Sequence, residues 1–269
     1  MIKIKNLIIL YPSFERGGAT VNLINFVNTC ALKNIKIHLI SNIKTKDKKH
    51  FVKKNIIFVN LKNKFDYKIL SRSITSIASI FLLLNLFKSI DYKNSLVISF
   101  QSHILPIIFS RLFRRKIIIR NSENIIEATK YADYKISALV IFLLKLFFYN
   151  FSNGIITNSN EAKKSLDLIT FKNKTKLIFN PYIKKIFSKK ITKRENIILS
   201  VGRLCKQKNQ SIAILAFANF LKKFPNYKLV LIGHGGDELK LKKLCLELNI
   251  NKNVIFKGWL PNPKKYYLK

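Results

Sequence analysis

Cysteine is scarce in this sequence of 269 residues, in which only Cys30, Cys205 and Cys245 occur, far apart and without a C-x-x-C pair. Disulfide frameworks and cysteine-based metal clusters need more numerous or closer cysteines. The spacing therefore excludes both and favours the reducing cytosol. Hydrophobic residues make up 48% of the chain, which excludes general disorder and supplies the core of one large domain or two smaller ones.

Acidic residues are also few: 13 Asp and Glu face 50 Lys and Arg, giving a formal charge of +37. Such an excess favours a nucleic acid or an anionic membrane as partner. The lysines are spread along the whole chain with many Ile, Asn and Phe, as in AT-rich coding sequences where lysine fills neutral surface positions. A nucleic-acid-binding protein would cluster its cations and aromatics, so that reading is only an alternative, and we expect no nucleic-acid partner.

Apolar runs of about 20 residues, the length that spans a bilayer, are missing. The longest candidates are 74–90 and 136–152, and Lys145 interrupts the second. We expect buried or interfacial helices there. The N-terminal apolar run is short and predicts a strand rather than a secretory signal. The expected location is the cytoplasm, with peripheral contact with the anionic inner face of the membrane as a further expectation.

Short, nearly continuous apolar runs alternate with helical patterns, which predicts an α/β fold with doubly wound parallel sheets. One helical pattern puts Leu241, Leu244, Cys245 and Leu248 on one face. Another, after Lys208, predicts an inward face of Ile212, Leu215, Ala216 and Phe220. The predicted strands are 7–11, 36–41, 56–60, 96–100, 116–120, 154–157, 176–179, 197–201, 228–233 and 254–256.

A polar, basic segment at 182–195 follows the turn signal Asn180-Pro181 and indicates a domain boundary. We predict a first Rossmann-like domain over residues 1–186 and a second over 187–269. The second has only three predicted strands and is therefore expected to be incomplete.

The first candidate site is the loop that carries Gly17 and Gly18, between the first strand and a helix. Paired glycines let the backbone approach a ligand, and amide N–H groups at a helix N-terminus favour an anion. The pattern is neither a dinucleotide fingerprint nor a P-loop. A simple tight connection is the alternative.

The second candidate site follows the strand 197–201, where Gly202 and Arg203 stand at its carboxyl end and Lys208 precedes a helix. Open α/β sheets bind ligands at this edge. An arginine fork and a lysine point charge suit a diphosphate. The alternative is that both belong to the general basic surface.

Two further loops contain glycines: Gly233, Gly235 and Gly236 permit a tight turn, and Gly258 precedes Trp259 and Leu260. In order, the segments GGAT, ITNSNEAKKSL, KLIFNPY, ILSVGRLCKQKN, KLVLIGHGG and NVIFKGWLPNP resemble a family 4 retaining glycosyltransferase of the two-domain GT-B fold. The resemblance runs from the first strand to the last residue. It implies a nucleotide-sugar donor, no cofactor or metal, and a glycan or lipid-linked acceptor, as in lipopolysaccharide or capsule synthesis.

The resemblance also implies residue roles. Arg203 and Lys208 would hold the donor diphosphate and stabilise the leaving nucleotide, with Gly202 beside them. Gly17 and Gly18 would approach phosphate and acceptor, and the loop Gly258, Trp259, Leu260 would lie near the base. His103 is a candidate catalytic residue, and Arg120 and Glu123 are candidate residues of the acceptor side.

One departure from the family pattern is that relatives continue with a further strand and helix set carrying two glutamates that bind the donor. This sequence stops at NPKKYYLK, and Glu238 and Glu247 lie in the wrong helix to substitute. We therefore expect a truncated product, a fragment or one half of a split enzyme. A catalytically inactive remnant at the membrane is the corresponding alternative.

Overall fold

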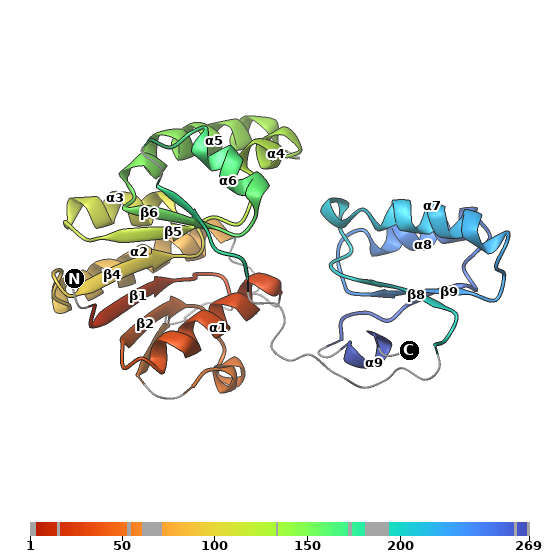
Figure 1. The fold of residues 1–269 in the computed structure, drawn as a ribbon, viewed down its shortest axis with the longest axis horizontal. Coiled ribbons are helices and arrows are strands. Elements are labelled where there is room, and N and C mark those ends of the chain that lie inside the picture. The colour runs from red at the N-terminus through yellow and green to blue at the C-terminus, as the bar shows by residue number, and fades with distance from the viewer. Residues whose placement is uncertain are drawn as a thin grey trace. The chain divides into compact units, whose positions relative to one another are not determined.

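The protein is described from a computed structural model, which defines residues 4–14, 17–52, 55–60, 72–132, 134–171, 174–180, 194–260 and 263–267. The chain forms two compact units, Met1–Lys184 and Lys185–Lys269 (Figure 1). The boundary predicted between residues 186 and 187 falls in 181–193, outside the described residues.

The first unit is built on a seven-stranded sheet in which all described pairings are parallel. Its order is β3-β2-β1-β4-β5-β6-β7, so the direction in which strands are added reverses between β1 and β4. Leu7, Ile8, Ile9 and Leu10 of β1 are all buried, because helices cover both faces of a parallel sheet. The strands are β1 (Asn6–Leu10), β2 (Lys36–Ser41), β3 (Ile56–Asn60), β4 (Ser95–Ser99), β5 (Ile117–Arg120), β6 (Gly154–Thr157) and β7 (Thr175–Leu177).

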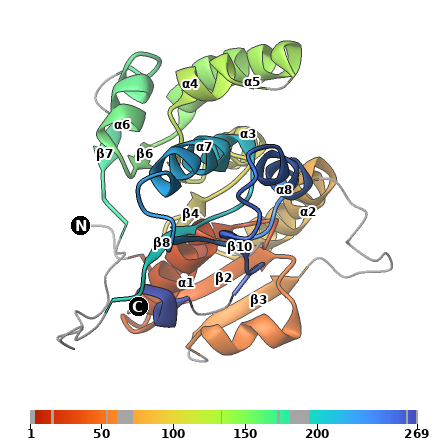
Figure 2. The ribbon, with the colours of Figure 1, turned by 90° about the vertical axis from the view of Figure 1, so that its right-hand side faces the viewer.

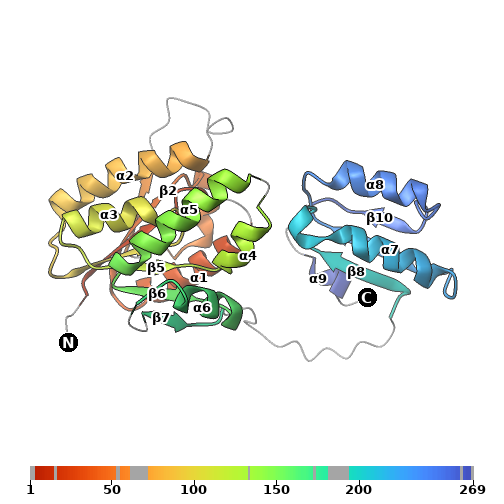
Figure 3. The ribbon, with the colours of Figure 1, turned by 90° about the horizontal axis from the view of Figure 1, so that it is seen from above.

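Helices of the first unit lie on the two faces of this sheet. They are α1 (Gly18–Ala31), α2 (Arg72–Ser89), α3 (Ile104–Leu112), α4 (Ile125–Lys130), α5 (Lys135–Phe148) and α6 (Asn160–Asp167), with the 3-10 turns η1 (Thr45–His50) and η2 (Tyr149–Phe151). Leu23 and Val27 of α1 enter the core on one face. On the other face the core includes Leu83 of α2, Ile107 of α3 and Leu166 of α6. Figure 3 shows α2, α3 and α5 crossing that second face.

The second unit contains a three-stranded parallel sheet of order β10-β9-β8. Its strands are β8 (Ile197–Val201), β9 (Lys228–Ile232) and β10 (Val254–Phe256), and its helical segments are η3 (Lys206–Lys208), α7 (Gln210–Leu221), α8 (Glu238–Glu247) and α9 (Lys264–Tyr267). Helices α7 and α8 lie side by side against the sheet (Figure 2). Ile214, Phe217, Leu229, Leu231 and Leu241 form the centre of this core.

The predicted inward faces of the two helices of this unit have different outcomes. In α8, Leu241 and Cys245 are buried, and Leu244 and Leu248 pack against them, as predicted. In α7 the prediction is wrong for three residues: Ile212, Leu215 and Ala216 are exposed, whereas Gln210, Ile214 and Phe217 are buried. Phe220 is half-buried and packs against the core, as predicted. Most positions of α7 are apolar, so several faces fit the pattern equally well.

The predicted α/β fold is confirmed, because each predicted strand occurs within two residues of its expected ends and every described strand pairing is parallel. Among the described residues, no helix combines the length and apolarity that crossing a membrane requires.

Candidate functional site

The candidate site of the first unit lies at the carboxyl ends of β1 and β4, where the strand order reverses. Ligands of open α/β sheets bind in the crevice at such a point. The two loops that leave these strands are tied together: Gln101 Oε1 accepts from Ser13 N at 3.0 Å, and Gln101 Nε2 donates to Ser13 O at 3.3 Å. One loop leads to Gly17 and the other to His103.

Gly17 and Gly18 stand at the start of α1, and both are exposed. A Cβ added at either glycine would meet nothing within 4 Å. Gly17, the N-cap, has φ 164° and ψ 178°, an extended conformation that any residue adopts. Among the described residues, no side chain caps this helix, and its first turn carries no acidic residue. The described residues therefore leave the backbone at this helix N-terminus without a side-chain cap, and an anion is favoured at such a place.

His103 precedes α3 at the end of β4. Its Nδ1 lies 3.0 Å from Ser99 Oγ, and its ring packs edge-on against Tyr149 at 6.0 Å between centroids. Burial, together with the positive charges of Lys145 and Arg120, lowers the pKa of His103 to about 3. The imidazole is therefore neutral near pH 7 and can donate or accept a hydrogen bond there.

Arg120 and Glu123 follow β5 but make different contacts. Arg120 donates to Asn180 Oδ1, and its guanidinium carbon stands 5.3 Å from the centre of the Phe100 ring. Glu123 forms an ion pair with Lys145 of α5. The structure brings Arg120 and Lys145 close enough to His103 for both charges to act on it.

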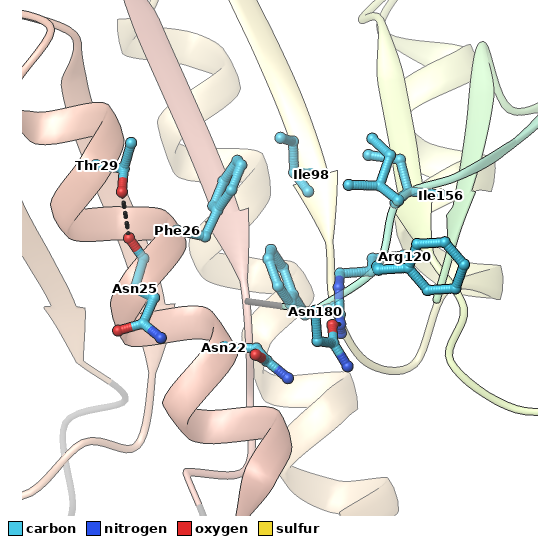
Figure 4. A pocket seen from close by; sticks show the side chains of 11 residues that line it. Asn22, Asn25, Phe26, Thr29, Ile98, Arg120, Ile156 and Asn180 are labelled. Atoms are coloured by element: carbon cyan, nitrogen blue, oxygen red, sulfur yellow. Dashed lines mark hydrogen bonds between the residues drawn. The ribbon is translucent and has the colours of Figure 1, made fainter. Parts of the chain in front are cut away.

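A cavity of about 240 Å³ lies beside α1 (Figure 4). Its polar wall includes Asn22, Asn25, Arg120 and Asn180. Phe26 of α1 and the isoleucines of β4 and β6 supply much of its apolar wall. The complete lining is Asn22, Asn25, Phe26, Thr29, Ile98, Phe100, Arg120, Ile156, Ile178, Phe179 and Asn180. Of the predicted acceptor-side residues, Arg120 lines this cavity and Glu123 does not.

In the second unit, the loops after β8, β9 and β10 are joined by backbone hydrogen bonds. Gly202 N donates to Ile232 O at 2.9 Å, Leu204 N donates to His234 O at 3.3 Å, and Gly233 N donates to Gly258 O at 2.9 Å. The carboxyl ends of the three strands therefore form one connected surface. All of the predicted residues of the donor site in this unit lie on it.

Two glycines permit this close contact between loops. A Cβ at Gly233, whose φ is +154°, would stand 1.7 Å from Gly202 O, and a Cβ at Gly235 would stand 2.1 Å from Leu204 O. No side chain fits at either distance, so the loop after β9 can pack against the loop after β8 only with glycine at both positions.

Arg203 and Lys208 lie on the loop after β8. Gln210, which is buried, donates from Nε2 to Arg203 O at 2.8 Å and fixes the backbone there. The alkyl chain of Lys208 runs beside Gly202, with its Cγ 3.9 Å from the position a Cβ would take. Both cationic side chains are exposed. Neither makes a side-chain hydrogen bond or ion pair with the described residues.

The loop after β10 continues this surface. Gly258 has φ +63°, a left-handed conformation that favours glycine. Leu260 is half-buried, and Trp259 is 48% exposed. Over the described ranges, His, Cys, Asp and Glu side chains do not gather in groups of three or more that could hold a metal ion.

Sequence reasoning missed several residues that shape these sites. The sequence predicts a turn at Asn180, and it does not indicate that the Asn180 side chain accepts a hydrogen bond from Arg120. Gln210 lies in a mostly apolar helix, and nothing in the sequence indicates that its side chain donates a hydrogen bond to the Arg203 carbonyl. Tyr149 contacts the His103 ring, and no local pattern connects residues so far apart in sequence.

Residues 182–269 match the protein family described as Glycosyl transferases group 1. The chain is 30% identical over 240 residues to the uncharacterized glycosyltransferase MJ1059 of Methanocaldococcus jannaschii, an alignment covering 80% of this chain and 56% of the relative. It is 29% identical over 168 residues to a Campylobacter jejuni N-acetylgalactosamine-N,N'-diacetylbacillosaminyl-diphospho-undecaprenol 4-alpha-N-acetylgalactosaminyltransferase, covering 60% of this chain and 45% of the relative.

The fold also matches a solved structure. Anabaena Alr3699/HepE in complex with UDP and glucose superposes with a TM-score of 0.69 at 18% identity, covering 96% of this chain and 70% of that chain. The predicted GT-B-like fold is thereby confirmed. The chain spans about half of the length of the two sequence relatives, and both of these are glycosyltransferases by name.

Proposed function

We propose that this protein is a retaining glycosyltransferase of family 4, which moves a hexose-type sugar from a nucleoside diphosphate donor, such as a UDP-sugar, to a glycan or lipid-linked acceptor. The observation that carries the proposal is the exposed pair Arg203 and Lys208 on the connected loops at the carboxyl ends of β8, β9 and β10. The family match over residues 182–269 covers this same surface and supports it.

In this proposal, Arg203 and Lys208 bind the donor diphosphate and stabilise the charge that develops on the leaving nucleotide. Arginine offers a planar fork and lysine a point charge, and two cations supply the charge stabilisation that a metal gives in other transferases. Neither side chain has to be released from an ion pair with the described residues before it binds. The loop of Gly258, Trp259 and Leu260 contacts the nucleotide base.

The first unit would supply the acceptor side. Gly17 and Gly18 leave room for phosphate or acceptor to reach the backbone N–H groups of α1. Neutral His103 can hydrogen-bond a sugar hydroxyl, and Arg120 offers a cation in the wall of the cavity. Glu123 acts on this edge through Lys145 rather than from the cavity itself.

A lipid-linked acceptor fits one relative in particular, since the Campylobacter jejuni enzyme is named for a diphospho-undecaprenol-linked acceptor. Work on such an acceptor would take place at the cytoplasmic face of the membrane. We therefore include peripheral membrane contact in the proposed function.

Calorimetric titration with UDP and with a UDP-sugar tests the donor role. We expect Arg203→Ala and Lys208→Ala each to weaken binding by roughly tenfold or more, because hydrogen bonds to charged groups contribute about 1.5–3 kcal/mol. Lys223→Ala, which removes an exposed lysine near the far end of α7, is the matched control and should leave binding unchanged. Equal losses in all three variants would show a general charge effect and contradict the proposal, as would an absence of UDP binding by the unmodified chain.

Turnover separates an active transferase from an inactive remnant. UDP release from a UDP-sugar in the presence of a lipid-linked acceptor supports the proposed activity. Donor binding without release under any acceptor tested would support the remnant instead.

A further inference from the structure

Helix α5 carries large apolar side chains on its outer surface. Its exposed apolar residues are Ile136, Leu139, Val140, Ile141, Leu143, Leu144, Leu146 and Phe147. Ile136 is 83% exposed and Leu143 is 54% exposed, and no residue of the helix is fully buried. In Figures 1 and 2, α5 is the outermost helix of the first unit. A contiguous apolar surface of this kind marks a binding site for another molecule or a membrane.

The one charged side chain in the middle of this helix points inward. The inner face is formed by Ala138, Phe142, Lys145 and Phe148, at the spacing of successive turns. Lys145, the only charged residue within 136–148, is 15% exposed and pairs with Glu123. Over residues 136–148 the helix thus turns its charge toward the protein and an uncharged face toward the outside, the reverse of an ordinary surface helix.

Cations and aromatic side chains stand at both ends of α5. Beyond its C-terminal end, Asn153 shares a cavity with the exposed residues Arg111, Arg114 and Lys116 and the buried Arg115. We call Arg111, Arg114 and Lys116 the basic cluster. Asp91 is the acidic group that acts on Arg115 from this side. Asn153 Oδ1 accepts from Ile117 N at 2.9 Å, which attaches the end of η2 to the strand that follows the cluster.

The aromatic residues complete this arrangement. Phe151 of η2 packs on Phe147 at 5.3 Å and on Phe148 at 6.4 Å between centroids. At the other end, Tyr131 and Tyr134 are exposed beside Lys130 and Lys135. Aromatic and basic residues flanking an apolar surface are typical of segments that lie at a membrane–water interface.

We propose that the outer face of α5 inserts into the boundary between headgroups and acyl chains of an anionic lipid bilayer, with the basic cluster on the lipid phosphates. A helix of 14 residues is about 21 Å long, too short to cross a hydrocarbon core of about 30 Å. It lies in the interface plane. The role of this contact rests on the proposed function, because the contact would bring the acceptor edge to a lipid-linked acceptor. The membrane binding itself does not depend on that function.

The charge of the protein favours a bilayer over a second copy of the chain. The net charge is +37, and both ends of α5 are basic. In a two-fold dimer through this face, like charges would oppose each other whichever way the helices were aligned. An anionic surface instead complements both ends and attracts the protein over a distance set by the salt concentration.

Vesicle sedimentation tests the proposal. The full chain should bind vesicles that contain phosphatidylglycerol, bind phosphatidylcholine vesicles far less, and lose binding as salt is raised. Leu143→Glu should lower the partition coefficient by roughly tenfold or more. The double change Arg111→Ala, Arg114→Ala should lower it by roughly tenfold and flatten the salt dependence. Ile212→Glu, the same change at a residue of α7 that is 62% exposed, is the matched control and should have no effect.

Tryptophan fluorescence gives an independent readout. Trp259 is the single tryptophan, so Leu143→Trp in a Trp259→Phe background reports on α5 alone. Insertion predicts a blue shift on adding anionic vesicles and quenching by brominated acyl chains. No binding to anionic vesicles, equal losses for Leu143→Glu and Ile212→Glu, or a dimer in light scattering that Leu143→Glu dissociates would each overturn the proposal. UDP titration of Leu143→Glu keeps the two proposals apart, since it should bind UDP as the unmodified chain does whether or not it binds vesicles.

Discussion

Two glycine loops of this protein stand at equivalent places, each at the carboxyl end of a parallel strand, but for different physical reasons. Gly233 and Gly235 after β9 are enclosed by the backbone of Gly202 and Leu204 at distances that exclude any Cβ. Gly17, near β1, has an extended backbone and no neighbour within 4 Å of an added Cβ. The fold requires glycine in the second unit, whereas in the first unit nothing in the described structure does.

Glycines that the fold does not require, such as Gly17 and Gly18, need another physical reason. Glycine in a folded chain loses more conformational entropy than other residues, so a loop that needs no glycine for packing gains no stability from two of them. Space for a ligand is the remaining physical advantage, and it agrees with the proposed role of Gly17 and Gly18. The loop after β9 serves instead to hold the surface that carries Arg203 and Lys208.

The largest expected effect is on the glycines that the fold requires. Gly235→Ala would force the Leu204 carbonyl to move by more than an ångström, and we expect the second unit to lose at least about 3 kcal/mol of stability. Hydrogen exchange of β8 and β9 amides measures this loss. Gly236→Ala in the same loop, where an added Cβ meets nothing within 4 Å, is the control. Equal protection in both variants would show that the loops do not pack as described.

An intermediate effect is expected at position 258, where the backbone conformation favours glycine although the surroundings leave space for a side chain. Its φ is +63° and nothing lies within 4 Å of an added Cβ. Gly258→Ala should therefore cost about 1–2 kcal/mol of unfolding free energy, while Gly258→Asn should cost less, because asparagine tolerates the left-handed region. Denaturant titration ranks the two, and a larger cost for asparagine would contradict the assignment.

A smaller effect is expected at His103, which follows β4 at the point where the strand order reverses. The pKa of His103 is about 3 in the folded state and is ordinarily 6.5. Between pH 3 and pH 6.5, the imidazole is therefore protonated in the unfolded chain and neutral in the folded chain. The stability from the neutral ring is full above pH 6.5 and is lost as the pH falls toward 3. Between pH 7 and pH 5, the unmodified chain should lose on the order of 1 kcal/mol more unfolding free energy than His103→Gln. Urea titrations at both pH values measure these losses. An equal loss in the unmodified chain and in His103→Gln would show that the ring is not held neutral.

The smallest effect on stability is expected at Gly18. Gly18→Ala places a better helix former at the first position of α1 without a clash, so the unfolding free energy should stay unchanged or rise by about 0.4–1 kcal/mol. The same change should lower UDP-sugar turnover by roughly tenfold or more, because it fills space beside the reacting groups. Thermal unfolding and UDP release measure the two quantities. Loss of stability would show that Gly18 belongs to the same class as Gly235.

The strands could be predicted because each is a short apolar run bounded by polar or turn residues, as in Lys36–Ser41 and Gly154–Thr157, which the sequence predicts with their observed ends. The inward face of α7 could not, because most of its residues are apolar and its exposed isoleucine at 212 resembles its buried isoleucine at 214. Contacts between residues distant in sequence, such as Arg120 with Asn180 or Gly235 with Leu204, follow from the tertiary arrangement and leave no local pattern.

The ion pair between Lys145 and Glu123 connects the outermost helix of the first unit to the edge of the sheet beside His103. If α5 lies in the headgroup layer, this ion pair keeps the acceptor edge at a fixed distance from the lipid surface. The enzyme would then select acceptors by the distance between the acceptor hydroxyl and its lipid anchor. A hydroxyl close to the anchor lies level with the acceptor edge, whereas the end of a long glycan extends beyond that edge.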